Sequence, residues 1–172
     1  VFEELDDDQS SRLLALMAPD AAADLVGRLL PASAESQLVH LPDRQQRRIL
    51  ELLHYPEDTA GGIMTNEIVV APGALSVAQA RPMLAQQMTN PDFVYYVFVV
   101  DDEQAQRLRG VLTLRDLFVA DDAARLEEIM LPNPMSVGPL EPAMAAARRL
   151  VDTHYAAMPV VNERGTLLGA IT

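Results

Sequence analysis

YPEDTAGGIMT, residues 55–65, divides the sequence into two parts of different character. Before it, apolar residues recur at helical spacing and prolines separate the runs. After it, the sequence changes to short apolar runs typical of strands. A proline, two carboxylates, Gly-Gly and Ile-Met mark the point at which a helical array passes into an α/β module. Because 172 residues accommodate two small domains, we expect a helical domain over residues 1–54 and a junction over residues 55–61.

The helical part is interrupted by Pro19, Pro31 and Pro42. Because proline is tolerated in the first turn of a helix but breaks its interior, each marks a new helix start. Asp20 and Asp43 follow two of these prolines, where a negative charge favours the helix dipole. The pattern predicts about four helices of roughly ten residues, a length that is marginal in isolation. The helices must therefore stack, and we expect a small superhelix.

The rest of the chain contains an internal repeat. Each copy is predicted to form strand, helix, strand, tight turn and strand, over residues 62–126 and 127–172. The first copy holds extra residues around Met88 to Phe93, and it alone retains a second helix, Leu114 to Ala120. The clearest matches are Ile63-Met64 with Ile129-Met130, Val99-Val100-Asp101 with Val160-Val161-Asn162, and Gly110-Val111-Leu112-Thr113 with Gly169-Ala170-Ile171-Thr172.

Pro82 conflicts with this pattern, because it lies inside the first-copy helix that Ser76 is placed to cap. An interior proline costs about 3 kcal/mol. We therefore expect a kink or a late start of that helix.

Composition excludes several classes of function. A net charge of −12 argues against binding a nucleic-acid backbone. The absence of cysteine excludes disulfides, thiolate zinc sites and cysteine nucleophiles. The short motifs of serine hydrolases, zinc peptidases, phosphate loops and dinucleotide-binding folds do not occur, and His40, His54 and His154 fall in different elements. We expect neither an enzyme nor a nucleic-acid partner.

The longest continuous apolar run, Val94 to Val100, has 7 residues, whereas a membrane-spanning helix needs about twenty. Val1 begins without a helix cap and Thr172 ends inside a strand-like run. We therefore expect a fragment of a longer chain.

The tandem β-α-β-β-α order and the stretch GVLTLRD, residues 110–116, resemble cystathionine β-synthase-type (CBS) domains over all of residues 62–172. With the helical prefix and the junction, the chain resembles the cytosolic part of MgtE-family magnesium channels. The resemblance implies an α+β fold, in which an all-α superhelical domain precedes a CBS pair with an incomplete second copy. It also implies a homodimer formed through the CBS pair. A connecting helix and the protein's own transmembrane pore would follow Thr172, placing this region on the cytoplasmic side of a bacterial membrane.

Asp20 and Asp24 stand four residues apart, and hence on one face of a helix. Mg²⁺ takes oxygen ligands and keeps most of its waters, so one or two carboxylates per ion suffice. The resemblance implies that this pair binds Mg²⁺ between the helical domain and the CBS pair. Glu57, Asp58 and the backbone carbonyl of Gly62 are weaker candidates at the junction. The alternative for these carboxylates is an ordinary solvated surface.

The resemblance also places a Mg²⁺ ligand in the second copy, where the family has an acidic residue at the dimer interface. In this sequence that position holds His154, and the neighbouring carbonyl belongs to Val151. Imidazole is a poor ligand for Mg²⁺, so we expect this site to be altered or lost.

A nucleotide cleft between the CBS copies is a second candidate site. Asp116 would accept hydrogen bonds from two ribose hydroxyls, and Arg115 would meet a phosphate. Tyr96 and Tyr155 would flank an adenine ring. The resemblance implies ATP as the ligand. The alternative is that the tyrosines fill a core and that Asp116 only stabilises a helix start.

These observations favour a regulatory region that senses Mg²⁺. At low Mg²⁺ the carboxylates of the helical and CBS domains would repel each other, and ions between them would favour a compact form that closes the pore. Two alternatives stay open: an adenine-nucleotide-sensing CBS module of another transporter or enzyme, and a plain dimerisation scaffold.

Overall fold

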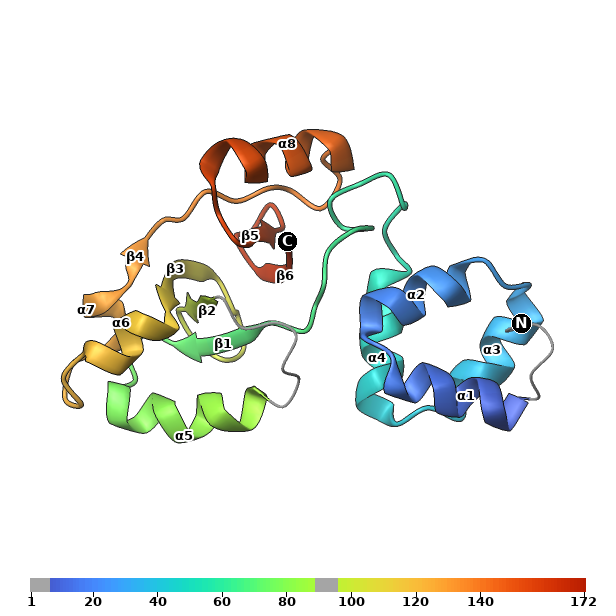
Figure 1. The fold of residues 1–172 in the computed structure, drawn as a ribbon, viewed down its shortest axis with the longest axis horizontal. Coiled ribbons are helices and arrows are strands. Elements are labelled where there is room, and N and C mark those ends of the chain that lie inside the picture. Colours follow the sequence, from blue (N-terminus) through green and yellow to red (C-terminus); the bar gives the residue numbers. More distant parts are fainter. Residues whose placement is uncertain (1–6, 89–95) are drawn as a thin grey trace.

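The structure, a computed structural model, describes residues 7–88 and 96–172. In the first of these ranges, four helices precede the junction, as the prolines predicted (Figure 1). The second and third begin at prolines, and the fourth follows Pro42 directly. α2 packs on α4, and α1 packs on α3. The four helices are α1 (Asp7–Leu16), α2 (Pro19–Gly27), α3 (Pro31–Leu38) and α4 (Asp43–Leu52).

The helices bury their apolar faces in a core that includes Leu14, Val26 and Ile49. This core does not end at the junction. Met64, near the start of the first repeat, and Met158 of the second repeat belong to the same cluster of buried side chains. The helical domain is therefore joined to the repeats by apolar contact as well as by the chain.

The repeats form two sheets. The first has the strand order β1-β2-β3-β4, with β1 and β2 parallel and the other pairs antiparallel; the second is the antiparallel pair β5-β6. The elements are β1 (Val69–Pro72), α5 (Val77–Gln87), β2 (Tyr96–Val100), β3 (Leu108–Thr113), α6 (Leu114–Val119), α7 (Leu126–Ile129), β4 (Leu131–Pro132), α8 (Ala143–Thr153), β5 (Met158–Val161) and β6 (Leu167–Ile171).

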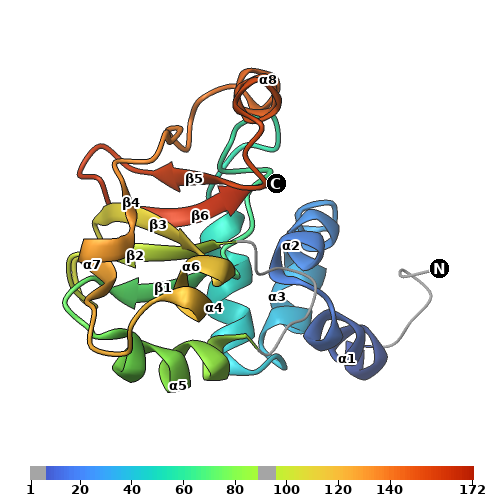
Figure 2. The same cartoon turned by 60° about the vertical axis from the view of Figure 1, so that its left-hand side comes forward.

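The two sheets lie between α5 and α8, as Figure 2 shows. Phe98 and Val111 of the first sheet share a buried apolar cluster with Ala157 and Ala170 of the second repeat. Val97 and Leu112 alternate with these residues and face a separate cluster with α5. The layers are thus helix, sheet, sheet and helix, with α1 to α4 beside them (Figure 1).

The start of each repeat pairs with the other repeat. β4, at the start of the second repeat, pairs with β3 of the first. Thr65, at the start of the first repeat, makes two backbone hydrogen bonds with Ala170 of β6, each 2.9 Å long. The sequence repeat therefore corresponds to two interlocked units.

α5 corrects one expectation from the sequence. It begins at Val77 and runs through Pro82 to Gln87, so of the two expected outcomes, a kink or a late start, the late start is wrong. Ser76 fixes the start, because its Oγ accepts from Gln79 N–H at 3.3 Å and its own N–H donates to Gln79 Oε1 at 3.0 Å. The extra residues expected around Met88 to Phe93 lie, apart from Met88, outside the described residues.

Among the described residues, no helix has both the length and the apolar character needed to cross a bilayer.

Candidate functional site

The junction lies against the second repeat. Ala60 N–H donates to the carbonyl of Glu141, and Ala143 N–H donates to the carbonyl of Asp58, both at 2.8 Å. These backbone bonds fix the junction on the segment that leads into α8. They also occupy the carbonyl of Asp58, whose side chain is exposed.

Gly62 allows the junction to turn tightly towards α2. Its N–H donates to Thr59 Oγ1 at 3.2 Å. A Cβ at this position would collide with the backbone of Pro56 and Glu57. The second glycine of the Gly-Gly pair is therefore required by the close approach of the chain to itself.

An open cleft of about 390 Å³ lies between α2 and the junction. Four of the residues predicted as metal ligands share it, although they come from two separate parts of the sequence. Asp58 and Val151 do not line it. The lining residues are Asp20, Ala21, Asp24, Arg28, Glu57, Gly62 and Ile63.

Asp20 is the residue in this cleft with an unsatisfied polar atom. Its Oδ1 is buried and has no hydrogen-bond partner among the described residues. A buried carboxylate oxygen without a partner is costly. Asp20 lies in the first turn of α2, where the helix dipole offsets part of that cost. Asp20 lines the cleft, so a cation there would offset the charge of its carboxylate.

The three carboxylates do not form a closed cage. In residues 7–88 and 96–172, no three His, Asp or Glu side chains lie close enough together to hold a metal ion as a group. Arg28 also contributes a positive charge to the cleft. The arrangement fits a hydrated Mg²⁺ that takes one or two carboxylates and keeps most of its waters. It does not fit a tight all-protein site.

Val151 and His154 lie away from this cleft, at the end of α8. His154 caps the helix in a left-handed conformation with φ 54°. Its N–H donates to the carbonyl of Val151 at 3.1 Å. The candidate carbonyl thus already accepts a helix-terminal hydrogen bond.

Asp116 stabilises the start of α6. Its Oδ2 accepts from Thr113 N–H at 2.8 Å and from Thr113 Oγ1 at 2.7 Å, and Asp116 N–H donates to Thr113 Oγ1 at 3.1 Å. The hydrogen bonds from the Thr113 side chain and backbone hold the pKa of Asp116 below its ordinary value of 3.8. Asp116 therefore remains ionised at neutral pH and can accept hydrogen bonds from ribose hydroxyls. It also stabilises a helix start, which is the alternative role expected from the sequence.

The two tyrosines are not brought together. Tyr96 lines a narrow cavity of about 10 Å³ between the sheets, with Phe98 and Ala157 among its neighbours. Tyr155 instead packs against the cluster that joins the helical domain to the second repeat. Arg115 is exposed at the start of α6. In this conformation the cavity is too small for an adenine ring, so the sheets would have to separate to admit one.

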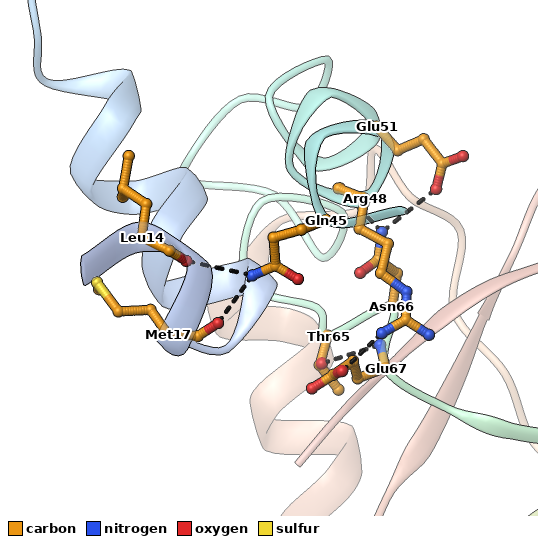
Figure 3. A network of polar contacts seen from close by, with 8 residues as sticks. All are labelled: Leu14, Met17, Gln45, Arg48, Glu51, Thr65, Asn66 and Glu67. Atoms are coloured by element: carbon orange, nitrogen blue, oxygen red, sulfur yellow. Dashed lines mark hydrogen bonds and ion pairs between the residues drawn. The ribbon is translucent and has the colours of Figure 1, made fainter. Parts of the chain in front are cut away.

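A polar network that the sequence did not indicate joins α4 to the segment before β1 (Figure 3). Arg48 Nη1 lies 2.6 Å from Glu67 Oε1. Asn66 Nδ2 donates to the carbonyl of Arg48 at 3.0 Å and to Glu51 Oε2 at 3.3 Å. The spacing of Arg48 and Glu51 on α4 was visible in the sequence, but their partners were not, because the contacts cross the junction.

Two domain families match the chain. Residues 1–58 match the MgtE intracellular N domain, and residues 60–122 and 126–172 match the CBS domain. The magnesium transporter MgtE of Thermus thermophilus is 37% identical over 132 residues, which are 77% of this chain and 29% of that protein. The aligned region thus spans less than a third of the length of this curated relative.

Solved structures match over nearly the whole chain. The crystal structure of the soluble part of a magnesium transporter has a TM-score of 0.89 and 34% identity, and the match covers 99% of this chain and 66% of that one. The cytosolic domain of the Mg²⁺ channel MgtE in complex with ATP has a TM-score of 0.84 and 31% identity, covering 100% of this chain and 75% of that one.

Proposed function

The chain belongs to the MgtE family of magnesium transporters, in the region that carries the N domain and the CBS pair, and we propose that it senses Mg²⁺. Two structures that match it over at least 99% of its length are of magnesium transporters and not of enzymes. The proposed location is the cytoplasmic side of the membrane. The proposed partner is a pore domain in the full-length protein.

The observation that carries this proposal is the buried, unpartnered Oδ1 of Asp20, in a cleft that also holds Asp24 and Glu57. These carboxylates come from α2 and from the junction, so a cation between them would be shared by two parts of the chain. Without a cation, Arg28 offsets one of the three negative charges, and the remaining like charges face each other across the cleft.

The energies are adequate for a switch. Two unit charges at 4 Å interact by about 1 to 4 kcal/mol, depending on local screening. A two-state equilibrium needs about 5.5 kcal/mol to move from one state to the other almost completely, so a few such sites suffice. Hydrated sites of one or two carboxylates suit weak, millimolar binding. Mg²⁺ in the cleft would favour the compact form, which in the full-length protein corresponds to the closed pore.

Small-angle scattering with and without millimolar Mg²⁺ tests this proposal, with matched ionic strength as the control. We expect Mg²⁺ to reduce the radius of gyration of the wild type, and Asp20→Asn to remove this effect. Glu35→Gln is the matched control, because Glu35 is an exposed carboxylate of the same domain outside the cleft. No compaction of the wild type beyond the ionic-strength control would refute the proposal.

Dimerisation through the CBS pair is the second part of the proposal. Large apolar side chains are exposed on α6 and on α8, among them Leu114, Phe118, Met144 and Val151. Leu114 and Phe118 lie four residues apart and so share one face of α6, and an exposed apolar face of this kind favours a protein partner. The partner proposed is a second copy of this chain.

ATP is proposed as a second ligand, at the narrow cavity beside Tyr96, which would widen as the sheets separate. A relative that is 31% identical was solved in complex with ATP. In this chain Asp116 is ionised and Arg115 is exposed beside it. Titration calorimetry with ATP, AMP and Mg²⁺ separates this role from Mg²⁺ sensing: strong AMP binding with indifference to Mg²⁺ would instead favour an adenine-nucleotide sensor.

A further inference from the structure

The helical domain meets the rest of the chain along two surfaces of opposite electrostatic character. At the α2 cleft, Asp20, Asp24 and Glu57 bring like charges together. Along α4, the charges are complementary: Arg48 pairs with Glu67 at 2.6 Å (Figure 3). In the proposed Mg²⁺ sensing a cation closes the first surface, where Arg28 offsets only part of the negative charge, whereas the second surface is held by its own opposite charges.

The ion pair is partly shielded from solvent. The side chains of Arg48 and Glu67 are 19% and 25% exposed. Asn66 adds two hydrogen bonds, one to the backbone of α4 and one to Glu51 Oε2. A shielded pair supported by further hydrogen bonds is screened less by salt than an exposed one.

The pair is also firmly connected to the rest of the helical domain. Gln45, one turn earlier on α4, donates from Nε2 to the carbonyl of Met17 at 2.8 Å and to that of Leu14 at 3.3 Å. α4 therefore holds the end of α1 on one side and the repeats on the other. Beside the ion pair lies a cleft of about 650 Å³, lined by α4 and both repeats. Direct contact here rests on polar groups rather than on a filled apolar interface.

We propose that Arg48, Glu67 and Asn66 form a metal-independent tether, which holds the α4 side of the helical domain on the repeats whether or not Mg²⁺ is bound. The helical domain then turns about α4 as the α2 cleft opens and closes. A tether of this kind keeps the two sides of the cleft aligned, and so reduces the Mg²⁺ concentration needed to close it. This role rests on the proposed Mg²⁺ sensing, but the contact itself exists without it.

Distances between spin labels test the tether. Since the sequence has no cysteine, Ala15→Cys on α1 and Ala78→Cys on α5 give one label pair in each chain, and both positions are exposed. Dilution with unlabelled chain removes the distances between protomers of a dimer. In EDTA we expect a narrow distance distribution for the otherwise wild-type chain. Arg48→Ala should broaden it and shift it to longer distances.

The matched control is Arg47→Ala. Arg47 is the neighbouring residue on α4, is exposed, and bonds only to its own helix among the contacts described, at the carbonyl of Asp43. Arg47→Ala removes the same charge as Arg48→Ala but leaves the contacts of the tether in place. The double variant Arg48→Glu with Glu67→Arg should restore the narrow distribution, because it reverses the pair. Circular dichroism confirms that each variant is folded.

A Mg²⁺ titration of the same distance gives the second measurement. If Arg48→Ala lowers the closed-to-open ratio about fivefold, the midpoint rises about fivefold for one ion and about twofold for two. If the label-to-label distance distributions of Arg48→Ala and Arg47→Ala in EDTA are identical, the proposal of a tether is refuted. A wild type that does not respond to Mg²⁺ would instead refute the sensing proposal, and the EDTA distances would still decide the tether.

Discussion

The carbonyl oxygen of Thr65 occupies the space in which a side chain at residue 169 would place its Cβ. Gly169 lies in β6 of the second repeat, and Thr65 lies near the start of the first repeat. The same relationship recurs with the repeats exchanged, because a Cβ on Gly110 would lie 2.7 Å from the carbonyl oxygen of Leu131. Each repeat thus needs a glycine where the other repeat crosses it.

Gly169→Ala is therefore expected to destabilise the fold. The added methyl group must displace the Thr65 backbone, and overpacking of this kind costs about 1–3 kcal/mol. Gly138→Ala is the matched control, because its Cβ would meet only the Glu141 side chain, at 3.7 Å. Urea unfolding followed by circular dichroism measures both. Equal free energies of unfolding for the two variants would contradict the interlocking of the repeats.

The glycines also explain why so much of the fold could be predicted from the sequence. Gly110 and Gly169 head the clearest match between the repeats, and Met64 and Met130 pack beside them. A contact that only glycine permits can be recognised from the sequence, because glycine occurs at the matching position of each repeat. The helix starts could also be predicted, since prolines and capping residues act within one helical turn.

The candidate site could be predicted only in part. Asp20 and Asp24 were visible because helical spacing places them on one face, and they share a cleft with Glu57 and Gly62. The position of Tyr155 was not visible, because matching places in two repeats do not face the same cleft once the repeats interlock. The Arg48–Glu67 pair left no local pattern, since tertiary contacts bring its partners together across 19 residues.

Asp20→Asn should separate stability from metal response. Without Mg²⁺, removal of one negative charge relieves repulsion in the α2 cleft, so the melting temperature should stay the same or rise. Millimolar Mg²⁺ should raise the melting temperature of the wild type and of Glu35→Gln, but raise that of Asp20→Asn much less. Differential scanning calorimetry at constant ionic strength measures these shifts. Equal Mg²⁺ responses in all three proteins would place the ion elsewhere.

Thr113→Val should flatten the acid limb of the stability profile. Hydrogen bonds from Thr113 lower the folded-state pKa of Asp116 below 3.8, so the ionised carboxylate stabilises the fold above that pH. This contribution is lost as the pH falls through the folded-state pKa. Thr113→Val removes the side-chain hydrogen bond, which is the largest cause of the lowered pKa, while the backbone N–H of residue 113 still lowers it. The pH dependence therefore becomes weaker, and loss of the helix cap costs about 1 kcal/mol at neutral pH.

The free energies of unfolding of the wild type and of Thr113→Val, measured between pH 7 and the acid limit, give the contribution of the Thr113 side chain. Asp101 also has a lowered pKa, but it titrates in both proteins and cancels in the difference. A difference between the two proteins that is constant with pH would show that the Thr113–Asp116 bonds do not set the acid response.

Arg115→Ala should weaken ATP binding. Loss of a charge-assisted hydrogen bond to phosphate costs about 1.5–3 kcal/mol, which is about tenfold or more in the dissociation constant. Arg109→Ala is the control, because Arg109 is an exposed arginine on the neighbouring strand β3. Isothermal titration calorimetry measures both. A loss of affinity in Arg109→Ala as large as that in Arg115→Ala would indicate only a general effect of charge.

Dimerisation through the CBS pair can be tested with two equally exposed apolar residues, Phe118 and Leu16. Each of them is 87% exposed. Phe118 lies on α6 of the first repeat, and Leu16 lies at the end of α1. If the CBS pair forms the dimer, Phe118→Asp places a charge in an apolar interface and should produce a monomer in sedimentation equilibrium. Leu16→Asp removes a similar apolar side chain from the helical domain, so it should leave the dimer intact. Monomers from neither variant would locate the interface away from α6, and monomers from both would show that the interface is not confined to the CBS pair.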